Sequence, residues 1–493
     1  MSSKGSNFIG SMGGLTPRPG LSPTIGHSAS SVSQLMVYAA GWVGEALDFT
    51  LGTPSWYPVV LSGAFPAVYS GGAWSRLSQT GATGLSGNTL SQAMTYFDAV
   101  PYYNADGDRF ELVFVNGVNK AFTYAVANDL TFSTLTNAPF ARYVATFDNR
   151  LIFANANDST FNLFPQRVAW SERGAPSIYT APTGGFEELL DAKGEITRLM
   201  AESDRLIIFF DSEIWQGLRI AFPFTFQFIR LEPKVGTQAS WSVAHTPHGM
   251  VFLGNDLNLY LLPAGGTPRA IGDAVWRHIR ETIAPRSVAA ANGVWDAVRG
   301  GYLLTYQTRQ STEQGVFVQF ETDRVTWNPV GFDMSSGWSI RRMGTTSMAT
   351  ASNFLRNATE RVLVADSGLT GMGNSNVLEW TSLATSDLGN PITCRYLTPL
   401  GNPNPTERQI VQEVRLDYRS VSASSMSLRI SPDFGTTYPV DRGVALPPAS
   451  ASAQTVLGVN MSAVYPTVEF VHDSGGTFVL QGASVLLTGG GHG

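Results

Sequence analysis

The chain has 493 residues and a mass of 53.1 kDa, with 43% hydrophobic, 11% aromatic and only 14% charged residues. Soluble domains usually carry about 25% charged residues, but the aromatic content excludes disorder for most of the chain. The net charge of −6 excludes the global basic field that nucleic-acid-binding proteins use. The length is that of roughly two to four domains, or of one large modular architecture with an appendage.

The basic residues are strongly biased, because lysine occurs only at Lys4, Lys120, Lys193 and Lys234 and the other 28 are arginines. Arginine is enriched and lysine depleted at protein–protein interfaces. A GC-rich genome explains the same bias equally well. Cys394 is the only cysteine, so the chain has no intrachain disulfide framework. The start, MSSKGSNFIGSMGG, lacks an apolar leader core, and we expect a soluble protein made in a cytoplasm.

The first 54 residues predict an N-terminal arm and a short helix. Residues 1–30 are rich in Gly, Ser and Pro and predict an extended arm. Apolar residues then recur with helical spacing between Leu35 and Ala46, and Gly52 and Pro54 mark the helix end.

From residue 55 onward, a polar turn followed by an alternating apolar strand recurs along the chain. Successive copies lie about 40–60 residues apart, which is the scale of one four-stranded propeller blade. The copies are residues 107–117, 148–158 and 203–213, with looser ones at 248–262, 299–308 and 360–368, and tryptophans recur near later strands at Trp170, Trp215, Trp327 and Trp380. The sequence therefore predicts an all-β fold with a β-propeller of roughly six to eight blades over residues 55–385.

One segment interrupts the β pattern. Ile271, Val275, Ile279 and Ile283 follow a four-residue spacing, which predicts an amphipathic helix of about three turns. It would begin after Gly272-Asp273, end before Pro285 and cover an edge of the propeller.

Residues 386–493 predict a C-terminal domain that resembles a β-sandwich, because several short strands follow one another in about 100 residues. The expected strands are Ile410–Tyr418, Ser425–Ile430, Thr455–Val459, Thr467–Val471 and Thr477–Leu487.

The sequence lacks the common catalytic motifs, including a Walker A loop, a GxGxxG fingerprint, a GxSxG elbow and an HExxH helix. His245 and His248 are the only close histidines, and this spacing places them on opposite faces of a strand. We therefore predict no catalytic, cofactor-binding or metal-binding residue and no enzymatic activity.

Ser431–Tyr438 matches the spacing of an Asp box, S-x-D-x-G-x-T-[WY]. We interpret it as a hairpin turn in which Asp433 accepts backbone N–H bonds, Gly435 takes positive φ and the aromatic residue packs beneath. A sialidase would need several such boxes, an arginine cluster for the substrate carboxylate and a tyrosine nucleophile near a carboxylate. This single copy lies outside the propeller region and favours the turn.

Glu187, Glu188 and Asp191 form an acidic segment after Gly184-Gly185. We expect a solvated loop, and the alternative is a negatively charged rim that faces a partner or a passage for DNA. Aromatic residues do not alternate with arginines, so a stacking groove for single-stranded nucleic acid is not predicted.

The run Tyr143–Tyr179 contains DNRLI, a polar loop, RVAWS and a Gly-x-Pro turn. It resembles a segment of tail proteins from tailed bacteriophages. The stretches LIIFFDSEIWQGL and VGTQASWSV, and the helix that follows Pro268-Arg269, continue the same order. Residues 139–286 thus resemble the tail nozzle proteins, also called tail hub or packaged-DNA stabilisation proteins, of short-tailed phages.

The resemblance implies a structural virion protein that forms a homohexameric ring below the portal and adaptor. Such a ring would form the distal DNA channel, retain the packaged genome until DNA ejection and hold needle, spike or fibre proteins. Its partners would be further copies of itself, the head-to-tail adaptor and double-stranded DNA that passes without sequence-specific binding. The protein would be assembled in the host cytoplasm and reside in the virion tail.

Two alternatives remain from the sequence. One is another tail component, such as a baseplate or fibre-attachment propeller, and the other is a glycan-binding or sialidase-like propeller.

Overall fold

A computed structural model describes residues 97–309 and 394–490 with short gaps, together with isolated strands between residues 4 and 79 and between 314 and 391. The chain divides into two compact units. One contains residues 23–338 and 343–379, and the other contains residues 1–22, 339–342 and 380–493. Among the described residues, no helix has the length and hydropathy of a membrane-spanning segment.

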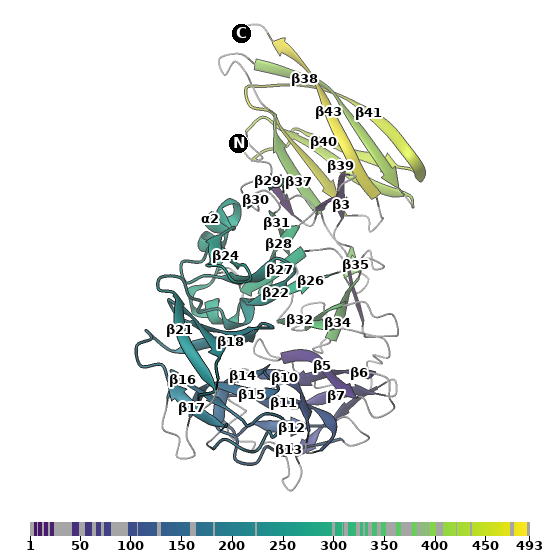
Figure 1. The fold of residues 1–493 in the computed structure, drawn as a ribbon. Helices are drawn as coiled ribbons and strands as arrows, with labels where there is room; N and C mark the ends of the chain where they lie inside the picture. The colour runs from purple at the N-terminus through teal and green to yellow at the C-terminus, as the bar shows by residue number, and fades with distance from the viewer. Residues whose placement is uncertain are drawn as a thin grey trace. The chain divides into compact units, whose positions relative to one another are not determined.

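The larger unit is a β-propeller with seven blades, counted over the described strands as groups of consecutive strands that pair with one another (Figure 1). The first blade consists of β5 (Trp42–Asp48), β6 (Ser55–Leu61), β7 (Ala67–Ser70) and β8 (Ala73–Arg76), and the second of β10 (Asp98–Asn104), β11 (Arg109–Val115), β12 (Phe122–Tyr124) and β13 (Thr131–Thr134). The third blade consists of β14 (Phe140–Phe147), β15 (Arg150–Asn157), β16 (Arg167–Trp170) and β17 (Gly185–Glu188). The fourth consists of β18 (Ile196–Ala201), β19 (Arg205–Phe210), β20 (Ile214–Arg219) and β21 (Phe226–Glu232).

The fifth blade consists of β22 (Ala244–Thr246), β23 (Gly249–Leu253), β24 (Leu259–Leu262) and β25 (Arg269–Ala270). The sixth consists of β26 (Asn292–Asp296), β27 (Gly301–Gln307) and β28 (Gln314–Glu321), and the seventh of β32 (Ser347–Ala351), β33 (Arg361–Ala365) and β34 (Val377–Thr381). Two smaller features are β9 (Ser78–Gln79), which pairs in parallel with β13, and the hairpin of β29 (Thr326–Asn328) and β30 (Gly331–Asp333).

The first strands of the sheets surround the propeller axis. Each contacts its neighbour in the order β5, β10, β14 and β18, and the 3-10 helix η1 (Ser240–Ser242) joins β18 to β26. Strand β22 also contacts β26, β26 contacts β32, and β32 returns to β5. This closure packs the first strand of every blade against its neighbours, which is how propellers limit exposed sheet edges. The predicted propeller is therefore confirmed.

The blades pack face to face, so their middle strands bury side chains on both faces. All six residues of β19, from Arg205 to Phe210, are buried. Leu206 and Ile208 pack toward the third blade, whereas Ile207 and Phe209 pack toward the fifth. This double burial explains why these strands appear in the sequence as almost continuous apolar runs.

The recurrent sequence pattern has a consistent place in the blades. Arg109, Arg150 and Arg205 each begin the second strand of a blade, and Arg150 and Arg205 are buried. Trp170 and Trp215 lie in third strands. Part of the arginine bias therefore serves contacts within the chain.

A buried ion pair joins three blades near the axis. Asp98 of β10 lies 2.9 Å from Arg198 of β18 and accepts a hydrogen bond from the backbone N–H of Val144 in β14. The Arg198 guanidinium also lies over the ring of Trp241. Burial raises the pKa of Asp98, and the Arg198 charge and the N–H donors oppose this rise.

The predicted helix is confirmed as α2 (Asp273–Thr282). Ile271, Val275, Ile279 and Ile283 are all buried, whereas the opposite face carries the exposed ion pair of Arg277 and Glu281. A 3-10 helix, η2 (Pro285–Ala290), follows directly because proline cannot continue the α-helical hydrogen bonding.

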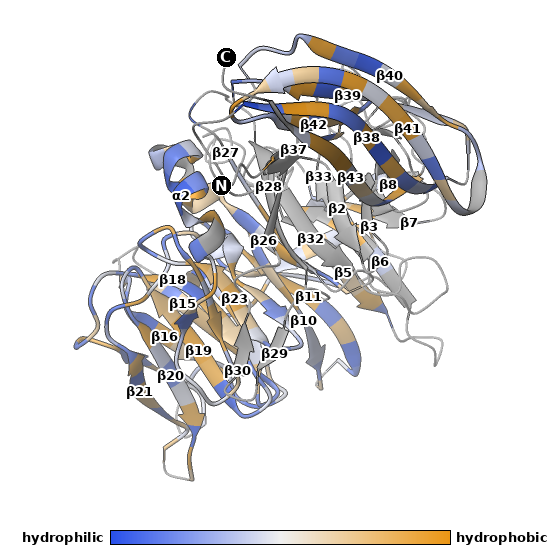
Figure 2. Ribbon diagram, turned by 90° about the horizontal axis from the view of Figure 1, so that it is seen from above, coloured by the Kyte–Doolittle hydropathy of each residue, from blue (hydrophilic) through white to orange (hydrophobic). Residues whose placement is uncertain are grey.

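The smaller unit is a β-sandwich of two sheets around one apolar core. Hydrophilic and hydrophobic residues alternate along its long strands, as Figure 2 shows. One sheet has the order β1 (Lys4–Ser6), β37 (Cys394–Pro399), β42 (Thr467–His472), β39 (Ser424–Ser431) and β40 (Val440–Leu446), and the other has the order β2 (Phe8–Ser11), β3 (Gly14–Pro17), β43 (Phe478–Gly490), β38 (Arg408–Ser420) and β41 (Ala449–Ala463). Shorter strands in this unit are β4 (Gly20–Pro23), β31 (Trp338–Arg342), β35 (Ser386–Asp387) and β36 (Asn390–Pro391).

The N-terminal predictions need correction. The prediction of an unpacked arm over residues 1–30 and of a separate region 1–54 is wrong, because β1 pairs with β37 and β3 pairs with β43. Trp42–Asp48 is the first propeller strand and not part of a helix, because it pairs along its whole length with β6. Residues 24–41, which carry the rest of the expected helix, lie outside the described residues.

Candidate anion-binding cluster at Asp148

The candidate site lies on one face of the propeller, which we call the Asp148 face. In an antiparallel four-stranded blade, the turn between strands one and two and the turn between strands three and four lie at the same end. The Asp148 face is this end of the second, third and fourth blades. It carries the turns at residues 104–109, 148–149, 171–184 and 219–225.

Asp148 occupies the tight turn between β14 and β15. Asp148 and Asn149 both have positive φ, 53° and 54°, and Phe147 pairs with Arg150 across the turn. These are the features of a two-residue type I′ hairpin, which Asp and Asn tolerate well. The turn therefore holds the Asp148 side chain at a defined position on this face.

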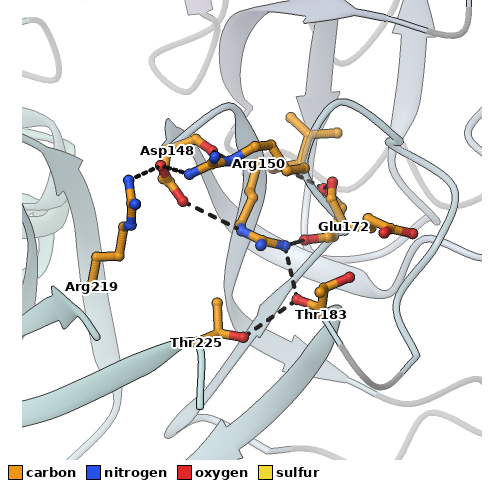
Figure 3. Close-up of polar contacts among 9 residues, drawn as sticks. Asp148, Arg150, Glu172, Thr183, Arg219 and Thr225 are labelled. Atoms are coloured by element: carbon orange, nitrogen blue, oxygen red, sulfur yellow. Dashed lines mark hydrogen bonds and ion pairs between the residues drawn. The ribbon is translucent and has the colours of Figure 1, made fainter. Parts of the chain in front are cut away.

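Three arginines from three different segments surround the Asp148 carboxylate (Figure 3). Arg173, in the segment after β16, donates to Asp148 Oδ1 and, over 3.2 Å, to its backbone oxygen. Arg219, at the end of β20, donates to the same Oδ1 over 2.9 Å. Arg150 Nε lies 3.7 Å from Oδ2. The cluster therefore joins the third and fourth blades.

The three arginines differ in exposure. The side chain of Arg150 is 9% exposed, and its NH1 group donates to the backbone oxygens of Ser171 and Thr183. The side chains of Arg173 and Arg219 are 48% and 60% exposed. The buried Arg150 guanidinium therefore holds the segment after β16 from the interior, whereas those of Arg173 and Arg219 face solvent.

The charges keep Asp148 ionised. Burial alone would raise its pKa, but the hydrogen bond and charge of Arg173, with the charges of Arg219 and Arg150, outweigh burial and lower it. The hydrogen bond to Asp148 in turn raises the pKa of Arg173. An acid with a lowered pKa is a poor proton donor near neutral pH, so the cluster suits charge recognition better than proton transfer.

The neighbouring hairpin of the second blade packs against this cluster. Ala105 N–H donates to the Gly174 oxygen over 3.2 Å. Gly174 has a φ of +74°, and a Cβ there would meet the Ala105 Cβ at 3.1 Å, so glycine permits this approach. The same hairpin carries Tyr103, whose hydroxyl donates to Asp108 over 2.5 Å. This hydrogen bond raises the pKa of Tyr103, which disfavours a tyrosinate nucleophile.

The structure places the Asp-box residues in a turn, as the sequence predicts. Asp433 accepts hydrogen bonds from the N–H groups of Thr436 and Thr437 and from the Ser431 hydroxyl. The Ser431 hydroxyl and these other donors lower the pKa of Asp433 to about 2. The Tyr438 ring lies near the Arg429 guanidinium, and Gly435 is outside the described residues.

The remaining residues named in the sequence analysis lie in different elements of the fold. Glu187 and Glu188 lie in strand β17 and not in a loop, and Glu188 pairs with Arg167. His245 lies in β22 and His248 in the following turn. Cys394 is buried in the sandwich core. Among the described residues, no three His, Cys, Asp or Glu side chains gather as metal ligands.

Sequence reasoning missed the cluster itself. Arg150 is part of the recurrent pattern, and Arg173 is part of the segment that resembles phage tail proteins, but Arg219 carries no local signal. Asp148 and Arg219 are 71 positions apart and meet only because consecutive blades are adjacent. The three arginines of the cluster hold the chain's own carboxylate, that of Asp148.

No protein-family model matches the sequence, and a search of curated proteins finds no relative. Similar solved structures include an exo-beta-1,3-galactanase from Phanerochaete chrysosporium, with 9% identity, a TM-score of 0.30 and coverage of 96% of this chain and 100% of that one. The WD40 domain of Neurospora crassa Pan2 has 7% identity, a TM-score of 0.38 and coverage of 76% and 97%. A tailspike protein 4 domain of bacteriophage CBA120 has 10% identity, a TM-score of 0.15 and coverage of 28% and 18%.

Proposed function

We propose that this protein is a structural component of a tailed bacteriophage virion, which forms the distal tail nozzle as a ring of six copies. The observation that carries the proposal is the resemblance of residues 139–286 to tail nozzle proteins, which begins with the phage tail-protein segment Tyr143–Tyr179. In the fold, this segment runs from strand β14 through the Asp148 turn and β16 to the loop around Gly174. At these positions one blade contacts its neighbours. The motif is therefore a feature of the propeller fold, and it does not indicate a catalytic function.

The charge of the chain supports a passage for DNA. The net charge is −6, and binding to DNA by counterion release would require lysines and arginines along the passage. Double-stranded DNA would therefore traverse the channel without adhering to it. The ring would hold the adaptor on one side and needle, spike or fibre proteins on the other.

The excess of arginine over lysine supports contacts between subunits only in part, because some of the arginines form contacts inside the propeller. Arg150, Arg198 and Arg205 are engaged inside the propeller, so only the exposed arginines remain for contacts between copies. We propose no catalytic role, since the Asp box is a turn and the arginines of the Asp148 cluster hold an internal carboxylate.

The test is the size and shape of the purified protein. We expect a six-fold ring in negative-stain micrographs and a particle of about six times the 53.1 kDa chain mass by mass photometry. In virions, labelled antibodies should mark the distal end of the tail below the adaptor. A monomer that hydrolyses a sialoside would refute the proposal, whereas labelling of a peripheral baseplate or fibre would favour the alternative tail component.

A further inference from the structure

The longest described strand, β41, lies at the open edge of its sheet. It has 15 residues and pairs with β38 alone among the described strands. Strands in globular proteins have about 5–6 residues on average. Over Ala449–Ala463, β41 contains neither a charged residue nor a proline. The unpaired backbone groups of such an edge are a template for another strand.

Other edge strands of this protein have the features that normally prevent such pairing. β40, the outermost strand of the second sandwich sheet, contains Asp441 and Arg442. In the propeller, β21 carries Arg230 and Glu232, and β17 and β25 have only four and two residues. Charged side chains and short length both discourage pairing between edges. β41 has neither feature, which indicates that its edge serves for binding.

One side-chain contact shows which backbone groups of β41 face outward. Arg442 of β40 donates to the Gly458 oxygen over 2.7 Å, which places this oxygen on the free edge. Residues 453–458 pair with β38 without a register shift, and backbone groups alternate between the two edges of a strand. The N–H and C=O groups of Gln454 and Val456 therefore face the free edge as well. A carbonyl oxygen has two lone pairs, so that of Gly458 can accept a second hydrogen bond.

This outward-facing stretch is complementary to itself. Val456 is the middle residue of β41 and is 50% exposed. In an antiparallel pair centred on it, Val456 faces Val456 of a second copy, and Gln454 faces Gly458. All three residues then lie in hydrogen-bonded pairs, in which two opposed residues exchange both N–H···O bonds. The central side-chain pair is apolar, and glycine leaves room for the opposed Gln454 side chain.

Charges near this edge do not oppose the approach of a second copy. Like charges that face each other directly destabilise a strand pair, and β41 has none. The charged residues of the adjacent part of β38 and of β40 are equal in number of each sign. They are Glu413, Arg415, Asp417, Arg419, Asp441 and Arg442.

We propose that two copies of this chain associate through β41, which pairs antiparallel with itself about a two-fold axis at Val456. The pairing joins a sandwich sheet of each copy into one continuous sheet. In such an isologous contact a surface meets the same surface of the other copy, whereas the contacts of a cyclic ring join two different surfaces. The β41 contact therefore links two chains, or two rings, and does not depend on the proposed nozzle function.

The first experiment is mild oxidation of Val456→Cys in the full-length protein. Opposed Cα atoms in a hydrogen-bonded antiparallel pair lie about 5.5 Å apart, within the range of a disulfide. We expect a disulfide between the two position-456 thiols, identified by peptide mass spectrometry. The matched control is Leu486→Cys, because Leu486 is 48% exposed but lies on β43, which is paired on both sides. The Val456→Cys dimer should form at least about tenfold faster, because pairing raises the effective thiol concentration.

The second experiment is sedimentation velocity over a wide range of protein concentration. The unaltered protein should form a species of twice the mass as concentration rises. Val456→Lys should lose this species, because two like charges would meet at the axis, and Val456→Thr should keep it, because threonine is uncharged and β-branched. Thermal unfolding of each variant shows that the fold is retained.

Three results would overturn the proposal. They are equal crosslinking of Val456→Cys and Leu486→Cys, a doubled species that persists in Val456→Lys, and absence of the doubled species from the unaltered protein. Rings of six that never double would leave the nozzle function standing and refute the β41 contact. Doubling without rings would support the β41 contact and refute the nozzle.

Discussion

At the scale of single residues, the sandwich core contains one buried histidine with a consequence for stability. His472 lies at the end of β42, and its ring is 2.9 Å from the Ser424 hydroxyl and packs against Phe478. Burial lowers the pKa of His472 to about 4, and the charge of Asp473 opposes this effect weakly. The folded protein therefore holds this imidazole neutral at pH values where an unfolded chain would protonate it.

This difference predicts a pH dependence with a definite sign. In the unfolded chain the pKa returns to about 6.5, so the unfolded state binds the extra proton as pH falls from about 6.5 to about 4, and stability falls in that window. Between pH 7 and pH 4.5, this histidine should lower the free energy of unfolding by about 2 kcal/mol. Urea unfolding of the protein and of His472→Gln at pH 7 and pH 4.5 measures it. Identical losses in both proteins would contradict this account.

At the scale of elements, the N-terminal strands complete the sandwich. β1 pairs antiparallel with β37, from Lys4 opposite Leu397 to Ser6 opposite Arg395, and β3 pairs with β43 through Leu15 and Leu480. These pairings join opposite ends of the chain through backbone hydrogen bonds. Because such bonds require little of the side chains, a segment rich in Gly, Ser and Pro can still form a strand.

The register predicts a specific disulfide. Opposed Cα atoms in an antiparallel pair lie about 4.5–5.5 Å apart, within the range of a disulfide. The double variant L15C/L480C should therefore form a crosslink within one chain on mild oxidation, seen by peptide mass spectrometry. L15C/V456C is the control, since β41 is not paired with β3. Crosslinked dimers in place of the internal bridge would show that the strand is exchanged between copies.

At the scale of the whole molecule, the two compact units have separate apolar cores. The propeller depends on closure, because each blade buries both faces against its neighbours and β32 must return to β5. The Asp98–Arg198 pair reinforces this arrangement by joining three blades. We therefore expect the two units to unfold as separate cooperative transitions.

Asp98→Asn tests this independence. The substitution leaves Arg198 buried without its counter-charge, which typically costs about 3–5 kcal/mol. By scanning calorimetry at pH 7, the propeller transition should move down by several degrees, while the transition that His472→Gln alters should stay in place. A shift of one common transition by both variants would show that the units unfold together.

The sequence alone determined those parts of this protein that depend on local patterns. Apolar periodicity located α2 and the long C-terminal strands, and the spacing of the recurrent turns identified blades. The Asp433 turn was also predictable, because its donors lie within four residues.

Only the tertiary structure decided which distant segments meet. It placed residues 4–17 in the C-terminal sandwich, made Trp42–Asp48 a strand through pairing with β6, and brought Arg219 to Asp148. The physical reason is that strand pairing and ion pairing link positions far apart in the chain, whereas periodicity reports only which face of an element is apolar. The composition gives the number of charged residues, but only the folded chain shows that three arginines meet at Asp148.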